Sequence, residues 1–182
     1  MSQKLESYLK NKLKGVNLKE IADILLFGSI VKGKEYPNDV DICIIFRKKI
    51  DLEVVNKISS KFKGINPHVS TLIIDNFFRK PHSLSKTILL EGKSILSGRQ
   101  LSKNFGFSSC SLYSYNLSKL NSSDKVRFVY LLKGRGKDVG IVKRFGGEWI
   151  ADSCFLLPIE KDNEILNIFK KWKLEYKKKE GL

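Results

Sequence analysis

The stretch that decides the fold is Ile24-Leu25-Leu26-Phe27-Gly28-Ser29, followed after nine intervening residues by Asp39-Val40-Asp41 and the apolar run Ile42-Cys43-Ile44-Ile45-Phe46. Each apolar run is typical of a buried strand, and the glycine-serine pair is typical of a tight turn. Alternation along a strand places Asp39 and Asp41 on the same face. Two carboxylates on one face repel each other unless a cation lies between them, and hard oxygen ligands suit Mg²⁺. The stretch therefore predicts two strands that carry a metal-binding acidic pair next to a glycine turn.

The turn that precedes the acidic pair has the chemistry of a phosphate-binding loop. Backbone N–H groups at Gly28 and the hydroxyl of Ser29 can donate to phosphate oxygens. Lys32 follows the turn and could neutralise triphosphate charge, although an ordinary solvated lysine is an equally good interpretation. The combination indicates metal-dependent chemistry on a nucleoside triphosphate such as ATP. The alternative is a glycine turn followed by a solvated edge strand that happens to carry two acids.

The arrangement resembles the nucleotidyltransferase superfamily, which includes DNA polymerase beta, the poly(A) polymerases and the minimal nucleotidyltransferases. The residues that carry the resemblance are Leu26-Phe27-Gly28-Ser29-Ile30-Val31-Lys32-Gly33-Lys34 and Pro37-Asn38-Asp39-Val40-Asp41-Ile42. The resemblance covers the first half of the chain and implies an α/β (α+β) fold, a mixed sheet with flanking helices. It also implies Mg²⁺ as cofactor, catalytic and metal-binding roles for Asp39 and Asp41, and nucleotide-binding roles for Gly28, Ser29 and Lys32.

The third acid that completes the metal site in the resembled family is not evident in this chain. The neighbouring strand is expected at residues 65–74, and neither of its faces carries a carboxylate. A relaxed site could use His68 or Ser70, or Asp75 or Glu91 could swing in. Alternatively, the domain has lost transferase chemistry and kept nucleotide or RNA binding. An enzyme and a non-catalytic descendant therefore both remain open.

Charge and composition narrow the class of partner. The 182 residues include 34 Lys and Arg against 19 Asp and Glu, a net charge of +15 that both halves share. Such an excess of positive charge favours RNA or DNA as the partner, with a lysine-rich compositional bias as the alternative explanation.

The three scattered cysteines and two histidines show no zinc-binding spacing. We find no signal peptide and no apolar run of membrane length, so we expect a cytoplasmic protein with no membrane partner.

The second half is expected to be a separate basic unit. We predict a nucleotidyltransferase-like domain over residues 1–100 and a small α/β domain over 108–182, with a Ser- and Gly-rich boundary at 99–110. A glycine-rich basic loop over 133–147 favours phosphate contacts. Four of its residues are the candidates for nucleic-acid binding, namely Arg135, Lys137, Lys143 and Arg144. The lysines after 170 are typical of a solvated, frayed end, or they form an electrostatic anchor.

Periodicity predicts the elements along the chain, and the expected helix caps are Ser2, Asp51, Ser83 and either Ser122 or Ser123. Helices are expected over 2–15, 29–33, 51–64, 83–91, 122–134 and 160–173, and strands over 21–27, 39–46, 65–74, 95–96, 111–117 and 149–157.

Three functions are compatible with these observations. The first is transfer of a nucleoside monophosphate from a nucleoside triphosphate to an RNA hydroxyl, with a protein hydroxyl as a further acceptor within the resembled family. The second is a catalytically inactive member of the same fold that binds RNA or DNA. The third is the antitoxin-like half of a two-protein system, which some minimal nucleotidyltransferases are.

Overall fold

The chain folds into two compact units, Met1–Phe107 and Ser108–Leu182. The structure is a computed structural model that describes residues 3–34, 38–79 and 83–181. The Ser2 cap predicted for the first helix lies outside the described residues. Among the described residues, no helix has the length and apolarity that crossing a membrane requires.

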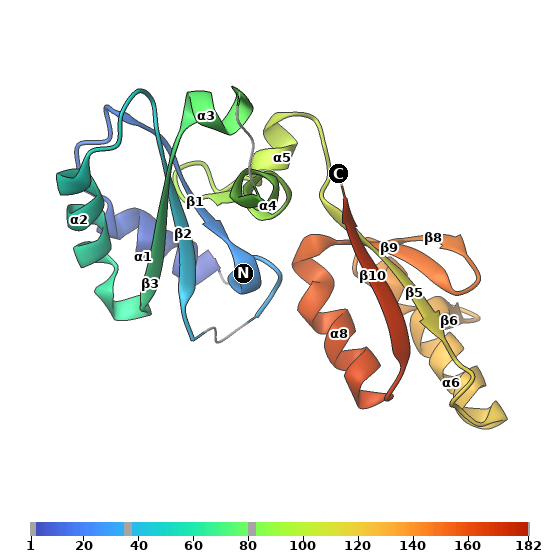
Figure 1. Cartoon of the computed structure of the whole chain (residues 1–182). Helices are drawn as coiled ribbons and strands as arrows, with labels where there is room; N and C mark the ends of the chain where they lie inside the picture. The colour runs from blue at the N-terminus through green and yellow to red at the C-terminus, as the bar shows by residue number, and fades with distance from the viewer. Residues whose placement is uncertain (1–2, 35–37, 80–82, 182) are drawn as a thin grey trace. The chain divides into compact units, whose positions relative to one another are not determined.

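The first unit is built on a mixed four-stranded sheet in the order β3-β2-β1-β4 (Figure 1). Its strands are β1 (Ile21–Phe27), β2 (Val40–Phe46), β3 (Pro67–Ile73) and β4 (Lys93–Ser94). β1 pairs antiparallel with both β2 and β4, whereas β2 and β3 run parallel. The predicted mixed sheet with flanking helices is therefore confirmed.

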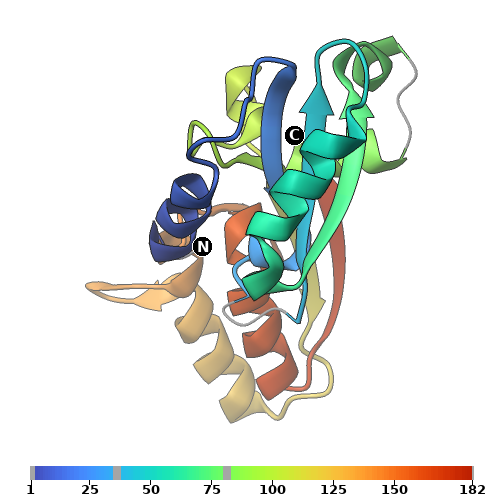
Figure 2. The same cartoon turned by 90° about the vertical axis from the view of Figure 1, so that its left-hand side faces the viewer.

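Helices cover both faces of this sheet, which explains why its central strands are apolar along their whole length. One face packs on α1 (Gln3–Lys12) and α2 (Leu52–Lys61), which lie side by side in Figure 2. The other face packs on α3 (Ile74–Arg79) and α4 (Ser83–Glu91). Successive residues of β1 alternate between these two cores, so Ile24 and Leu26 lie in the first core, and Leu25 and Phe27 lie in the second.

Local signals explain where the helices of this unit begin. The Asp51 carboxylate caps α2 by accepting hydrogen bonds from the N–H groups of Glu53 and Val54 at 3.0 and 3.2 Å.

Two short helices of the first unit were not predicted, α3 directly after β3 and α5 (Leu101–Asn104) within the expected boundary segment. The expected strand at 95–96 is instead β4, two residues earlier, because pairing with Leu25 and Leu26 determines its position.

The second unit follows the order β5 (Cys110–Asn116), α6 (Ser122–Lys133), β8 (Glu148–Ala151), β9 (Cys154–Pro158), α8 (Asp162–Lys171) and β10 (Glu175–Gly181). Its sheet has the order β10-β5-β9-β8, and all neighbouring strands are antiparallel. This β-α-β-β-α-β succession is the ferredoxin-like arrangement. Aromatic side chains from the sheet and the two long helices fill the core, which includes Tyr113, Tyr115, Phe128, Phe155 and Phe169.

The second unit corrects several expectations. The lysine-rich end is not a frayed tail, because Glu175–Gly181 forms the edge strand β10 and pairs along its whole length with β5. The strand expected at 149–157 is a hairpin of β8 and β9. The helix α6 is capped by Asn121, whose side chain accepts from the N–H of Asp124 at 2.8 Å, rather than by Ser122 or Ser123.

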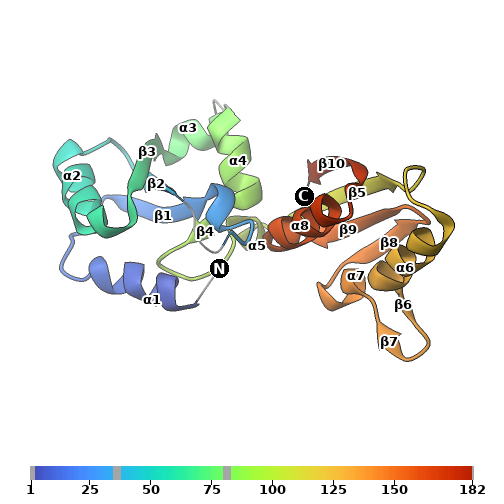
Figure 3. The ribbon, with the colours of Figure 1, turned by 90° about the horizontal axis from the view of Figure 1, so that it is seen from below.

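The glycine-rich basic loop also contains regular structure. It holds the short hairpin β6 (Gly134–Arg135) and β7 (Asp138–Val139), followed by α7 (Ile141–Arg144). Figure 3 shows this hairpin extending away from α6 and α7. Its base requires glycine, because Gly134 has φ +88° and a Cβ there would overlap the backbone oxygen of Asp138.

Candidate active site

Strand register brings the glycine turn and the acidic pair together. In the β1–β2 pair, Phe27 lies opposite Asp41, so the next residue, Gly28, reaches the Asp41 side chain. Gly28 has φ +74°, and a Cβ at this position would overlap the Asp41 carboxylate. Only glycine avoids strain at this position. The left-handed backbone conformation disfavours any residue with a side chain, and the Asp41 carboxylate leaves no space for a Cβ.

The parallel pairing of β2 and β3 decides what lies on the other side of Asp41. His68 is its direct partner in the register, and His68 Nδ1 lies 3.2 Å from Asp41 Oδ1. The Asp41 side chain is 26% exposed and the His68 side chain 71% exposed. A histidine thus stands next to Asp41, and no carboxylate of β3 does.

Asp39 lies directly before β2 and is exposed. The segment around it is held at two points, because the N–H of Val40 donates to the Asn66 oxygen at 3.2 Å and the Asn66 side chain donates to the Asn38 oxygen at 3.1 Å. These bonds tie the entry of β2 to the start of β3. Asp39 and Asp41 are therefore carried on a fixed stretch of backbone.

A buried carboxylate, Glu91, reaches the turn from the end of α4. Its Oε2 accepts a hydrogen bond from the N–H of Gly28 at 3.0 Å, and its Oε1 pairs with Lys32 Nζ at 2.8 Å. The Glu91 side chain is 7% exposed and that of Lys32 is 23% exposed. Sequence reasoning considered Glu91 only as a remote metal ligand, and no signal in the sequence connects it with Gly28 or Lys32.

Ser29, a predicted member of the site, and Asp75, a candidate third acid, have different surroundings. Ser29 is half-buried in the one-turn helix Gly28–Ile30, and its backbone oxygen accepts from the N–H of Lys34 at 3.0 Å. Asp75 does not join the site, because it lies on α3 and pairs with Arg79 at 2.9 Å on the surface. β3 separates Asp75 from His68, since the two lie at opposite ends of that strand.

The donor set can be compared with what Mg²⁺ requires. Among the residues that the structure describes, no group of three Asp, Glu, His or Cys side chains is close enough to hold a metal ion. Mg²⁺ commonly takes only one or two protein carboxylates and completes its shell with water and substrate phosphates. Two carboxylates, Asp39 and Asp41, match the number of protein ligands that Mg²⁺ commonly takes.

The predicted nucleic-acid residues all lie on the exposed surface of the second unit. Arg135 is on β6, with its guanidinium 5.1 Å from the centre of the exposed Tyr130 ring. Lys137 lies in the hairpin turn, and Lys143 and Arg144 lie in the last turn of α7. The aromatic residues Phe128 and Trp149, in contrast, belong to the core of this unit.

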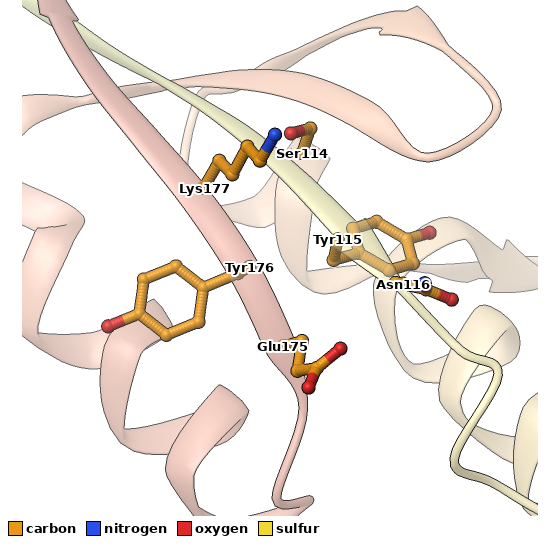
Figure 4. Close-up of a pocket in the computed structure, with 6 residues that line it drawn as sticks. All are labelled: Ser114, Tyr115, Asn116, Glu175, Tyr176 and Lys177. Atoms are coloured by element: carbon orange, nitrogen blue, oxygen red, sulfur yellow. The ribbon is translucent and has the colours of Figure 1, made fainter.

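Each unit also has a surface hollow that contains none of the predicted site residues. In the second unit a hollow of about 430 Å³ lies along β5 and β10, where Figure 4 shows the Lys177 and Ser114 side chains together and Tyr176 extending away. In the first unit an apolar hollow of about 370 Å³ lies among Phe77, Phe78, Leu89 and Phe105.

Comparison with known proteins identifies the first unit. Residues 3–100 match the model of the family described as polymerase beta, nucleotidyltransferase. One solved structure that contains a similar chain is that of the tri-AMPylated Shewanella oneidensis HEPN toxin in complex with MNT antitoxin. The similarity to it has 16% identity and a TM-score of 0.34, and covers 55% of this chain and 78% of that one. No curated protein matches. Since the family model spans more than half of the chain, the protein belongs to the polymerase beta nucleotidyltransferase family.

Proposed function

We propose that the protein transfers a nucleoside monophosphate from a nucleoside triphosphate to a hydroxyl group of RNA in a magnesium-dependent reaction. The observation that carries this proposal is the contact between the left-handed Gly28 and the Asp41 carboxylate. That contact puts a turn able to bind phosphate next to a side chain able to bind a metal. Membership of the nucleotidyltransferase family supports the same reaction class.

The residues of the site have separate tasks in this reaction. Ser29 and Lys32 bind the β- and γ-phosphates, and Gly28, whose own N–H donates to Glu91, lets the backbone approach them closely. Asp39 and Asp41 would hold the magnesium ion. Magnesium, when bound, neutralises triphosphate charge and polarises the reacting phosphate. The acceptor oxygen forms a bond to the α-phosphorus while the bond from that phosphorus to the bridging oxygen breaks. Pyrophosphate leaves with that oxygen, and the hydroxyl proton passes to a base or to water.

The basic hairpin of the second unit is our candidate for the RNA contact. Arg135 and Lys137 lie on an extension that carries only one acid, Asp138, between Gly134 and Val139. The stacking of Arg135 on the exposed Tyr130 ring presents a planar cation and an aromatic face together, which suits unpaired bases and phosphates. This combination favours single-stranded RNA over a protein surface.

The test of the transfer reaction is the movement of label. Purified protein is incubated with Mg²⁺, with small RNA and with each α-labelled nucleoside triphosphate in turn. We expect label in RNA with the wild-type protein and a loss of at least about 100-fold in Asp41→Asn, because a metal-binding charge is removed. The matched control is Asp75→Asn, which removes a surface acid from the same unit. Label in the protein instead of RNA would identify a protein acceptor and contradict the RNA proposal.

The RNA contact is tested by the salt dependence of binding. Arg135→Ala combined with Lys137→Ala should weaken RNA binding and reduce the slope of log K against log salt by about 1–1.5, since each single-strand phosphate contact contributes about 0.7. The matched control is Lys170→Ala with Lys171→Ala, which removes the same charge from the exposed end of α8. Equal losses in both pairs would show that RNA responds to net charge and not to the hairpin.

A second candidate function follows from His68. Because a histidine, and not an acid, is the partner of Asp41 on β3, a protein of this fold that binds RNA without transfer is the alternative. The same two assays distinguish them. RNA binding that Asp41→Asn leaves intact, together with no label transfer from any nucleoside triphosphate, would favour the binding protein.

A further inference from the structure

Glu91 is a buried charge next to the nucleotide site, and the proposed reaction gives it no task. Both of its carboxylate oxygens are used, one by the Gly28 N–H at 3.0 Å and one by the Lys32 ammonium at 2.8 Å. The whole residue is 5% exposed. A carboxylate this deeply buried is tolerated only where it is paired and hydrogen-bonded. Its partners are the turn and the lysine that we assign to the triphosphate site.

The position of Glu91 follows from strand pairing. β4 pairs antiparallel with β1, with Leu25 opposite Ser94 and Leu26 opposite Lys93. Continuing the same register by two residues brings Glu91 to Gly28. The helix α4 ends at Glu91, and a Cβ at the next residue, Gly92, would overlap the Ile88 oxygen. The chain therefore changes from helix to strand within one residue, and this tight change delivers the carboxylate to the turn.

Glu91 and Asp41 together fix the conformation of Gly28. The Asp41 carboxylate fills the space where a side chain would project, and Glu91 binds the N–H of the same residue. The oxygen of Gly28 in turn accepts from the N–H groups of Val31 and Lys32 at 3.2 and 3.3 Å. Hydrogen bonds therefore fix both the N–H and the oxygen of Gly28. The ion pair with Glu91 places the Lys32 ammonium beside the same turn.

We propose that Glu91 is a positioning residue of the nucleotide site, which holds Lys32 and the Gly28 turn in the arrangement that receives the triphosphate; this rests on the proposed function. A lysine ammonium has three donors, so a bond to Glu91 leaves Lys32 able to contact a phosphate oxygen as well. Protein kinases hold their phosphate-binding lysine with a glutamate in the same manner. Pre-ordering a long side chain lowers the entropy that nucleotide binding must otherwise overcome.

The test measures binding of a non-hydrolysable ATP analogue with Mg²⁺ by calorimetry, in the full chain. Glu91→Gln keeps an acceptor for the Gly28 N–H and removes the charge that holds Lys32. We expect its Kd to rise about tenfold, the scale of one charge-assisted hydrogen bond. Lys32→Met should give a similar loss. The double variant should bind no more weakly than the weaker single variant, because both changes remove the same arrangement.

Matched variants separate positioning from stability. Asp75→Asn, which breaks the exposed pair with Arg79, should leave the Kd unchanged. If Glu91→Gln does not fold, Glu91→Asp keeps the charge but shortens the side chain, and an intermediate loss of affinity is expected. In the transfer assay, Glu91→Gln should raise KM for the triphosphate more than it lowers kcat.

Three outcomes would overturn the proposal. Wild-type affinity in a folded Glu91→Gln variant would make Glu91 purely structural, and additive losses in the double variant would separate it from Lys32. Tighter binding by Glu91→Gln would make the carboxylate a competitor of the phosphates. In all three the proposed function survives, whereas a wild-type protein that binds no nucleoside triphosphate contradicts the proposed function itself.

Discussion

Strands β2 and β10 have the same length and opposite chemistry. β2 reads Val-Asp-Ile-Cys-Ile-Ile-Phe and is buried except at Asp41, whereas β10 reads Glu-Tyr-Lys-Lys-Lys-Glu-Gly and is largely exposed. β2 lies inside a sheet that helices cover on both faces, and β10 is the edge of a sheet in the second unit. Apolarity thus reveals a central strand from its sequence, whereas an edge strand can be hidden by the charges that protect it from pairing with other chains.

Charge within β10 is also used for folding. Lys178 lies opposite Tyr113 and pairs with the buried Asp162 at 2.5 Å, while Tyr113 donates to the same carboxylate at 2.7 Å. The neighbouring Lys177 and Lys179 are exposed. One lysine of three therefore takes part in a buried network, and alternation along the strand determines which one.

The largest effect should come from breaking this network. Lys178→Met keeps the aliphatic stem but leaves Asp162 without its cation, so we expect a loss of about 3–5 kcal/mol in the stability of the second unit. Lys179→Met on the same strand should change it by less than about 0.5 kcal/mol. Tryptophan fluorescence during denaturant unfolding measures this directly, because both tryptophans of the chain, Trp149 and Trp172, belong to this unit. Equal effects of the two substitutions would mean that the Asp162 pair contributes nothing.

A smaller loss is expected in the first unit from Gly28→Ala. The new Cβ would occupy a left-handed backbone position and overlap the Asp41 carboxylate, for a cost of about 2–4 kcal/mol. Gly15→Ala is the matched control, with φ +77° and open space around it, and should cost about 1 kcal/mol. Hydrogen exchange of the β1 and β2 amides is the measurement. A Gly28→Ala loss no larger than that of Gly15→Ala would rule out the contact with Asp41.

Alkaline pH should weaken the first unit through Cys43. Burial raises the pKa of its thiol from 9.0 to about 12. Because the folded pKa lies above the unfolded one, the contribution of this thiol to stability is complete below pH 9 and is lost as the pH rises toward 12. At pH 10 the loss is about 1 kcal/mol. The difference in Tm between pH 8 and pH 10 should shrink in Cys43→Ala, and an unchanged difference would assign the effect to other groups.

The smallest effects compare the two capped helices. Asp51→Ala removes the cap of α2 in the first unit, and Asn121→Ala removes that of α6 in the second, each at a cost of about 1 kcal/mol. Asp51→Ala should lower stability slightly more than Asn121→Ala, because Asp51 accepts from two N–H groups and carries a negative charge, which is favourable at a helix N-terminus. Denaturant unfolding followed by circular dichroism tests both. A larger loss at Asn121 would contradict this order.

Much of the first unit was predictable because its signals are local. Apolar runs marked β1 and β2, Asp51 marked the start of α2, and the spacing of Gly28 and Asp41 indicated the family. The second unit was less predictable since its strands are short or charged. The hairpin of β6 and β7 and the division of residues 149–157 into β8 and β9 depend on cross-strand pairing, which periodicity does not reveal.

The sequence by itself determined the family, the acidic pair, the glycine turn and the excess of positive charge, because each of these is a matter of residue type and short spacing. Only the tertiary structure decided that Glu91 binds Gly28 and Lys32, that His68 stands next to Asp41, and that Lys178 pairs with Asp162. The contacts of Glu91 and His68 join residues 27 to 63 positions apart, and that of Lys178 joins residues 16 positions apart, through strand register and helix packing. Register is a property of the assembled sheet, where burial of apolar faces selects one alignment, and no single segment contains it.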